Sequence, residues 1–201
     1  YALRSVPERL ADTELYLRYA QTIYEGAPYD AGGMRALRAP GYPLFFAGCW
    51  TLAGEPSARA VLWAQALLGV MGAALVYGLG RYFERQGAPA GIALAALTIA
   101  LFEPYGLLLG ILELSESLFS FSLLLGCWLL VTSIESKSLL RSLFTGITLG
   151  SATLVRPSSL AIWPVLFAAI FLAGMTHHAG RQWALCGLVG FLLVLGPWWV
   201  R

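Results

Sequence analysis

The feature that most constrains the fold is the near-continuous series of apolar runs over residues 60–201. A helix that crosses a bilayer needs about 20 apolar residues, and only 12% of this chain is charged, where soluble domains carry about 25%. The predicted fold is therefore an all-α, polytopic transmembrane helical bundle of about six spans. We expect these spans at roughly 60–80, 88–110, 115–134, 139–155, 158–175 and 183–200.

Residues 1–59 have a different composition, with six arginines and five prolines. We expect this segment to form a long first extracytoplasmic loop with juxtamembrane helices, and residues 60–201 to form the bundle. The apolar stretch 42–54 is too short to cross a membrane and predicts a helix that lies along the interface. Paired glycines predict close helix packing, at Gly69/Gly72, Gly146/Gly150 and Gly187/Gly190.

The loops between the predicted spans alternate in charge. Every second loop is basic, and these loops hold Arg81, Arg85, Lys137, Arg141, His177, His178 and Arg181. The loop between the second and third spans holds only acids, namely Glu103, Glu113 and Glu116. The positive-inside rule places the basic loops in the cytoplasm, and residues 1–59 outside despite their arginines. This topology gathers four polar residues at the outer membrane face: Asp12, Arg38, Glu116 and Arg156.

The composition excludes several functions. The net charge of +2, with no basic cluster among aromatic residues, argues against a nucleic-acid partner. The cysteines Cys49, Cys127 and Cys186 lack the spacing of a metal site and are interpreted as small apolar side chains. The chain also lacks a Ser-His-Asp order and a phosphate-binding glycine loop.

Asp12 lies at the edge of the apolar face of a helix predicted over residues 13–25. The residues that share its face are Leu15, Tyr16, Tyr19 and Ile23, whereas Glu14 points the other way. Two interpretations are open. An aspartate that precedes a helix is a good N-cap, and a carboxylate beside a membrane face can act in chemistry.

Residues 35–43 read RALRAPGYP, in which Pro40 and Pro43 argue against a regular helix and Gly41 allows a sharp turn. This turn would place the Arg38 guanidinium and the Tyr42 hydroxyl side by side at the interface. A guanidinium binds two phosphate oxygens at once, but interfacial arginine and tyrosine also contact lipid headgroups. Both interpretations remain open.

Glu116 and Arg156 flank predicted spans. Acidic and basic residues at membrane depth are functional candidates, because they are costly there. Glu116 falls in the first turn of the third span, where the helix dipole favours an acid. A purely structural Glu116–Arg156 ion pair that holds the bundle together is the alternative.

Four short motifs, in this order, resemble the membrane glycosyltransferases of the GT-C superfamily, in the branch of protein mannosyltransferases and aminoarabinose transferases. They are Asp12, Tyr16, Ala20 and Gly26 (D-x3-Y-x3-A…G); residues 38–43 (R-x-P-G-Y-P); Ser115-Glu116; and Gly146, Gly150 and residues 154–157 (G-x3-G…L-x-R-P). Family members often have Asp-Glu where this chain has Asp12-Thr13, and Glu14 lies on the wrong helix face to replace the second acid.

The resemblance implies a span before Tyr1, further helices after Arg201, and a bacterial inner-membrane protein whose active site faces outside. It implies inverting transfer of a sugar from a polyprenyl-phosphate donor to a glycan, lipid or protein acceptor. Asp12 would be the general base. Arg38 and Arg156 would stabilise the departing phosphate, and Tyr16 and Tyr42 would contact substrate.

The second catalytic candidate, Glu116, could position the acceptor, help to hold a divalent cation or orient Arg156. Two acids are too few to establish a metal site, so we predict no cofactor. Two alternative functions remain at this stage. One is a lipid-linked sugar transporter or flippase, and the other is a non-catalytic membrane subunit of a glycosylation complex.

Overall fold

The computed structural model describes residues 11–30, 38–104, 112–161, 163, 168 and 178–200, except for the side chains of residues 11, 12, 178 and 179. The described helices are α1 (Ala11–Tyr24), α2 (Gly41–Ala53), α3 (Ala58–Arg85), α4 (Ile92–Phe102), α6 (Glu116–Ser136), α7 (Leu139–Val155), the short 3-10 helix η1 (Pro157–Ser159) and α9 (His178–Trp199). These residues contain no β-strand, and the predicted all-α fold is confirmed.

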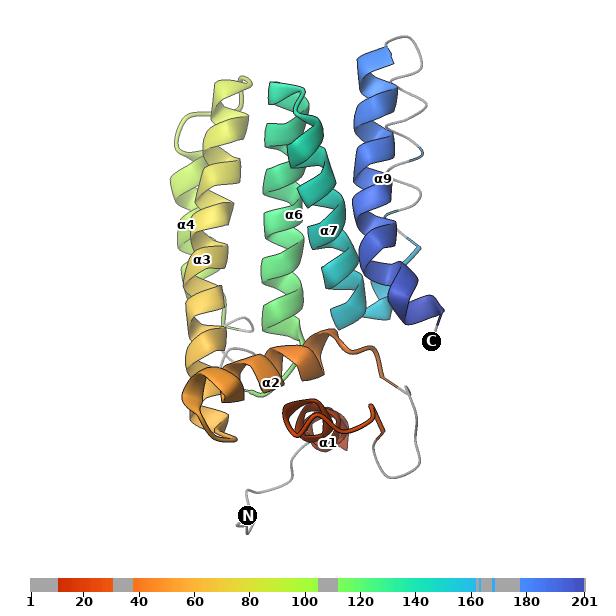
Figure 1. Ribbon diagram of the computed structural model, residues 1–201. Helices are drawn as coiled ribbons and strands as arrows, with labels where there is room; N and C mark the ends of the chain where they lie inside the picture. Colours follow the sequence, from red (N-terminus) through yellow and green to blue (C-terminus); the bar gives the residue numbers. More distant parts are fainter. Residues whose placement is uncertain are drawn as a thin grey trace.

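The long helices run side by side, and two shorter ones lie across one end of them. Figure 1 shows α3, α4, α6, α7 and α9 as a bundle of upright helices, with α2 and α1 beneath it and transverse to it. The basic residues of α3, α7 and α9 lie in the helix turns nearest the upper end, namely Arg81, Arg85, Arg141 and Arg181. Helices α3 and α6 run towards this end, and α4, α7 and α9 run away from it.

Among the described helices, three are long and apolar enough to cross a membrane: α3, α6 and the stretch Gly180–Trp199 of α9. Two of the other predicted spans, those near 88–110 and 139–155, contain the shorter apolar helices α4 and α7. The predicted span 158–175 and residues 105–111 fall largely outside the described residues. The bundle thus has membrane-spanning helices, and its predicted span count is not tested by these residues.

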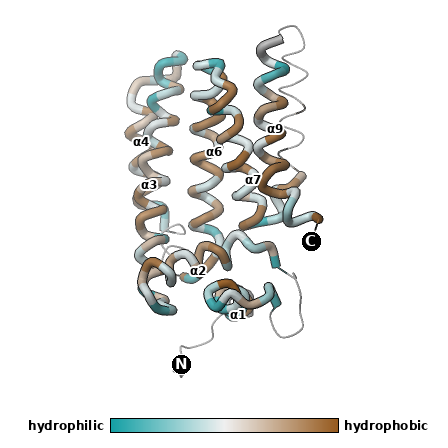
Figure 2. The backbone as a smooth tube through the Cα atoms, in the orientation of Figure 1, coloured by the Kyte–Doolittle hydropathy of each residue, from teal (hydrophilic) through white to brown (hydrophobic). Residues whose placement is uncertain are grey.

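The outer surface of the bundle is apolar. Trp63 is 76% exposed and Leu193 is 61% exposed, although burial of such side chains is favourable in water. Figure 2 shows hydrophobic residues along the middle of the helices and hydrophilic ones at their ends. This distribution is typical of helices whose sides contact lipid, and it places the protein in a membrane.

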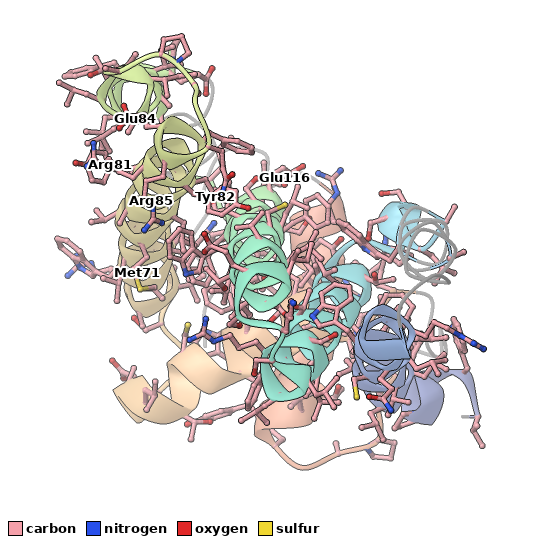
Figure 3. All side chains as sticks on the ribbon, turned by 90° about the horizontal axis from the view of Figure 1, so that it is seen from above. Met71, Arg81, Tyr82, Glu84, Arg85 and Glu116 are labelled. Carbon is pink, nitrogen blue, oxygen red and sulfur yellow. The ribbon has the colours of Figure 1, made fainter. Side chains whose placement is uncertain are left out.

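The Glu84 side chain, in the last turn of α3, forms hydrogen bonds to the start of α4 at the upper end of the bundle. Its carboxylate accepts hydrogen bonds from the backbone N–H groups of Gly91 and Ala93, at 2.8 and 3.1 Å, and pairs with Arg81 at 2.6 Å. Figure 3 looks down on this end and shows Glu84 on the side of α3 that faces α4. The carboxylate therefore caps the first turn of α4, whose orphan N–H groups need acceptors.

Helices α7 and α9 approach closely through glycines. A Cβ atom on Gly146 would lie 2.8 Å from the Phe191 backbone nitrogen, and one on Gly150 would lie 3.0 Å from the Phe191 carbonyl oxygen. The predicted glycine contacts are thus confirmed for this helix pair. They are wrong for Gly69, where a Cβ atom would meet nothing within 4 Å among the described residues.

Candidate functional site

The predicted site residues with described side chains gather at the end of the bundle that carries α1 and α2. They come from five parts of the chain: Tyr16 from α1, Arg38 from the segment before α2, Tyr42 from α2, Glu116 from the start of α6, and Arg156 from the end of α7. The structure therefore brings together residues that are up to 140 positions apart. Their chemical roles stay predictions.

Glu116 and Arg156 form an ion pair. The Arg156 Nη1 atom donates to Glu116 Oε1 at 3.2 Å, and the guanidinium also lies 5.8 Å from the centre of the Phe119 ring. The two side chains are 26% and 41% exposed, so the pair is accessible from one side. The Arg156 guanidinium uses one N–H group in this pair, and its other N–H groups can donate to an anionic group.

The end of α7 is set by Pro157, which is the first residue of η1. A proline disfavours helical geometry in the residue before it, and Arg156 is accordingly extended, with φ −135° and ψ 99°. This break directs the chain out of α7 at Arg156. The proline thus explains why the basic residue lies at the helix end, where it reaches α6.

Tyr16 contacts two other predicted binding residues, Arg38 and Tyr42. Its ring lies 5.1 Å from the Tyr42 ring in an edge-to-face arrangement, and the Arg38 guanidinium carbon lies 5.9 Å from its centre. The Arg38 carbonyl accepts a hydrogen bond from the Tyr29 hydroxyl at 3.0 Å. Arg38 and Tyr42 therefore pack on the same aromatic side chain.

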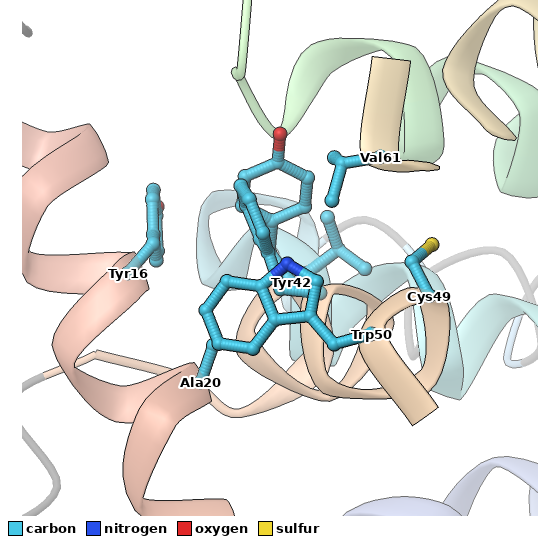
Figure 4. Close-up of a cluster of buried hydrophobic side chains, with 8 residues drawn as sticks. Tyr16, Ala20, Tyr42, Cys49, Trp50 and Val61 are labelled. Carbon is cyan, nitrogen blue, oxygen red and sulfur yellow. The ribbon is translucent and has the colours of Figure 1, made fainter. Parts of the chain in front are cut away.

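The irregular turn predicted at residues 35–43 is wrong for residues 41–43, which belong to α2, and residues 35–37 lie outside the described part of the structure. Helix α2 begins at Gly41 and includes Pro43 in its first turn, where the missing proline N–H would have no helical partner in any case. One face of α2 is buried, through Tyr42, Phe46 and Trp50. Figure 4 shows this aromatic cluster between α1 and the bundle.

Gly41 allows the start of α2 to pack directly against the backbone at the end of α7. A Cβ atom at this position would lie 2.6 Å from the backbone carbonyl carbon of Leu154 and 2.7 Å from the Val155 nitrogen. We expect Gly41→Ala to cost about 1–3 kcal/mol of stability, because backbone atoms cannot yield to the added methyl group. Thermal unfolding of the purified variant tests this. Gly48→Ala is the control, since its Cβ atom would meet nothing within 4 Å in the described structure.

Two residues that are not among the predicted site residues, Gln65 and Thr13, fix the segment that leads into α6. The Gln65 amide donates to the carbonyls of Leu112 and Leu114 at 3.1 and 3.2 Å, and Thr13 Oγ1 donates to the Glu113 carbonyl at 3.2 Å. Gln65 is 1% exposed although it belongs to a span. A lone amide in an apolar run is the signal that could have identified it.

The charges of two carboxylates act on the buried Tyr42 hydroxyl. Burial raises the pKa of this hydroxyl far above its usual value, and the charges of Glu113 and Glu116 raise it further. The hydroxyl therefore stays protonated and can donate a hydrogen bond. Cys49 lies in the same apolar cluster, where burial raises the pKa of its thiol.

The backbone of Asp12 lies in the first turn of α1, one residue after the helix begins at Ala11. Its side chain is outside the described part of the structure. Its neighbour Thr13 contacts the segment that leads into α6, and this contact holds the first turn of α1 near Glu113. Glu14 is exposed and pairs with Arg18 at 2.7 Å, on the helix face predicted to point away from the site.

Comparison with known proteins gives one match, which covers most of the chain. Residues 37–200 match the profile of the dolichyl-phosphate-mannose-protein mannosyltransferase family. The chain belongs to this family. Its members are glycosyltransferases of the GT-C type, as the resemblance of the four motifs predicts, and the specific branch stays a prediction. No curated protein and no solved structure matches significantly.

The range that matches the family includes only some of the predicted site residues. Arg38, Tyr42, Glu116 and Arg156 lie within the matched residues, whereas Asp12 and Tyr16 precede them. Among the described residues, no group of three His, Cys, Asp or Glu side chains is arranged to hold a metal ion. Family membership implies a polyprenyl-phosphate sugar donor and a membrane setting.

Proposed function

We propose that this protein transfers a sugar from a polyprenyl-phosphate donor to a glycan, lipid or protein acceptor at the extracytoplasmic face of a bacterial inner membrane. The observation that supports this function best is the gathering of Tyr16, Arg38, Tyr42 and the Glu116–Arg156 pair beside α2. This position suits a donor whose lipid tail stays in the bilayer while its phosphate and sugar reach the interface.

The proposed reaction is an inverting displacement at the anomeric carbon. The acceptor hydroxyl oxygen forms the new bond to this carbon as the bond to the phosphate oxygen breaks, and the lipid phosphate leaves with the bonding electrons. Asp12 accepts the proton of the acceptor hydroxyl. Arg38 and Arg156 stabilise the negative charge that collects on the phosphate. No cofactor is included in this proposal.

The proposed topology follows from the charge of the two bundle ends. Arg81, Arg85, Lys137 and Arg141 lie at the end opposite the site, which we assign to the cytoplasm by the positive-inside rule. Residues 1–59 then form the first extracytoplasmic loop, and α1 and α2 are its juxtamembrane helices. The bundle of residues 60–201 supports them.

A transporter is less consistent with this arrangement. Transporters bind their substrates near the middle of the membrane, on interrupted helices. Glu116 and Arg156 instead lie where α6 begins and just after α7 ends. A non-catalytic subunit is the other alternative, and it predicts that site variants leave sugar transfer intact.

We expect Arg156→Gln to lower sugar transfer on the order of 10²-fold, because it removes a donor from the phosphate and leaves Glu116 without its partner. The assay uses the whole protein in membranes, with radiolabelled polyprenyl-phosphate sugars. The control is Arg59→Gln, which removes an exposed arginine at the same end of the bundle. Unchanged transfer in Arg156→Gln would contradict the phosphate role. If the wild-type protein moved the lipid-linked sugar across the membrane without transferring the sugar to an acceptor, the transporter function would be favoured.

A further inference from the structure

We propose that Tyr42, Glu113 and Glu116 form a subsite for the hydroxyl groups of a sugar, and that Glu113 is a further substrate-binding residue. This inference rests on the proposed function and adds to it a residue and a recognition chemistry. The arginines bind the phosphate in the proposed function, whereas these three side chains bind the sugar itself.

Three buried oxygen atoms at this place have no hydrogen-bond partner among the described residues, namely Tyr42 Oη, Glu113 Oε1 and Glu116 Oε2. The Tyr42 side chain is 0% exposed, and Figure 4 shows its hydroxyl pointing out of the apolar cluster, towards the segment that leads into α6. Buried polar atoms are nearly always hydrogen-bonded in folded proteins. Glu113 and Glu116 both act electrostatically on Tyr42, so the three orphan oxygens belong to one region, and they leave hydrogen-bonding capacity that no described residue uses and that a ligand could take.

The position of Glu113 is fixed by its neighbours rather than by a helix. Three successive carbonyls, those of residues 112–114, each accept a hydrogen bond from a buried side chain, either Gln65 of α3 or Thr13 of α1. Gln65 is 1% exposed and Thr13 is 5% exposed, so water does not compete for these bonds. Such support is what a binding side chain needs to hold its geometry.

The three orphan atoms define the chemistry of the ligand. Ionised carboxylates only accept hydrogen bonds, whereas a tyrosine hydroxyl both donates and accepts. A sugar hydroxyl can donate to Glu113 or Glu116 and accept from Tyr42. A phosphate has only acceptor oxygens and would be repelled by both carboxylates. The phosphate therefore belongs with Arg38 and Arg156, and the sugar ring belongs with this subsite.

A bound cation is a weaker explanation for the missing hydrogen-bond partners of these three oxygen atoms. The Arg156 guanidinium already lies 3.2 Å from Glu116 and compensates one of the two negative charges. Only two carboxylates converge, and a hard divalent cation takes at least about six oxygen ligands. Hydroxyl donors satisfy the same acceptors without a further charge.

The test compares Glu113→Gln with Glu55→Gln, a control that removes an exposed carboxylate at the same end of the bundle. The whole protein in membranes is given the sugar it transfers fastest among polyprenyl-phosphate mannose, glucose and galactose, and then each mono-deoxy analogue. We expect the wild type to lose about 10–100-fold in kcat/KM for one deoxy donor, the effect of losing a hydrogen bond to a charged group. Glu113→Gln should no longer discriminate at that hydroxyl, and Glu55→Gln should.

The arms of the experiment separate donor from acceptor. Donor hydrolysis is measured without acceptor. If Glu113→Gln then no longer distinguishes the donor from its deoxy analogue, the hydroxyl groups belong to the donor sugar. An unchanged donor preference with a raised KM for the acceptor assigns them to the acceptor. The first result supports the subsite, and the second would overturn it, because these side chains are proposed to bind the sugar of the donor.

Tyr42→Phe provides a second variant in case Glu113→Gln folds poorly. It removes an unpartnered hydroxyl, so we expect an equal or higher unfolding temperature together with reduced transfer. Wild-type kinetics in both Glu113→Gln and Tyr42→Phe would overturn the subsite while leaving the transferase function in place. A raised Mg²⁺ requirement with intact deoxy discrimination would also overturn it, in favour of a cation. No transfer by the wild type from any polyprenyl-phosphate sugar would remove the proposed function and this inference with it.

Discussion

Asp12→Asn is expected to lower sugar transfer by about 10²–10⁴-fold, the usual contribution of a general base. Asparagine has nearly the same shape as aspartate and is also tolerated at helix starts, so α1 should keep its position beside Glu113. The measurement is release of radiolabelled sugar from a polyprenyl-phosphate donor by membranes that contain the whole protein. Donor binding should be unchanged, because the base acts on the acceptor.

The matched control for this prediction is Glu14→Gln, two residues further along α1. Glu14 is exposed and paired with Arg18, so its amide variant should transfer sugar at the wild-type rate. Equal activity of Asp12→Asn and Glu14→Gln would leave Asp12 with a structural role in the first turn of α1. Glu116 would then become the first candidate for the base.

Gly146→Val is expected to abolish the folded bundle. The new Cβ atom would overlap the Gly187 carbonyl oxygen and lie 2.8 Å from the Phe191 nitrogen, both of which are backbone atoms of α9. Overpacking usually costs about 1–3 kcal/mol, and a clash with a helix backbone should exceed about 3 kcal/mol. The measurement is the yield of monodisperse protein in detergent, followed by its thermal unfolding.

Gly69→Val is the matched control, because this glycine also lies in a spanning helix but has open space around its Cβ position in the described structure. We expect it to give a yield close to that of the wild type. If Gly146→Val gave the same yield and unfolding temperature as Gly69→Val, α7 and α9 could not be packed as closely as described.

Much of the fold could be predicted from hydropathy alone. The span predicted at 139–155 coincides with α7, and those predicted at 60–80 and 115–134 fall within α3 and near α6, because long apolar segments have few alternatives in a membrane. Within the span predicted at 88–110 the described helix is α4, and residues 105–111 lie outside the described part of the structure. That helix ends at Phe102, where Glu103 is extended and Pro104 follows.

The gathering of the predicted site residues was also predictable, since helix parity determines which loops share an end. Side-chain contacts across the chain were not. Gln65 and Glu113 are 48 positions apart in the sequence. No local pattern shows that Gln65 holds the segment that contains Glu113 by hydrogen bonds to its backbone. The helical start of α2 could not be predicted from Pro43, because a proline that breaks a helix interior is compatible with its first turn.

The seating of Gly41 against the end of α7 has a consequence for how the protein is made. Because a ribosome adds roughly 5–20 residues per second, roughly ten seconds separate the synthesis of Gly41 from that of Leu154, its contact in α7. During that delay α2 can pack on α1 through Tyr42 and Trp50, but it lacks Val155 of α7, which belongs to the same apolar cluster. Arg156, which follows Val155, has not been made either. The predicted site residues therefore come together only after α7 has been synthesised.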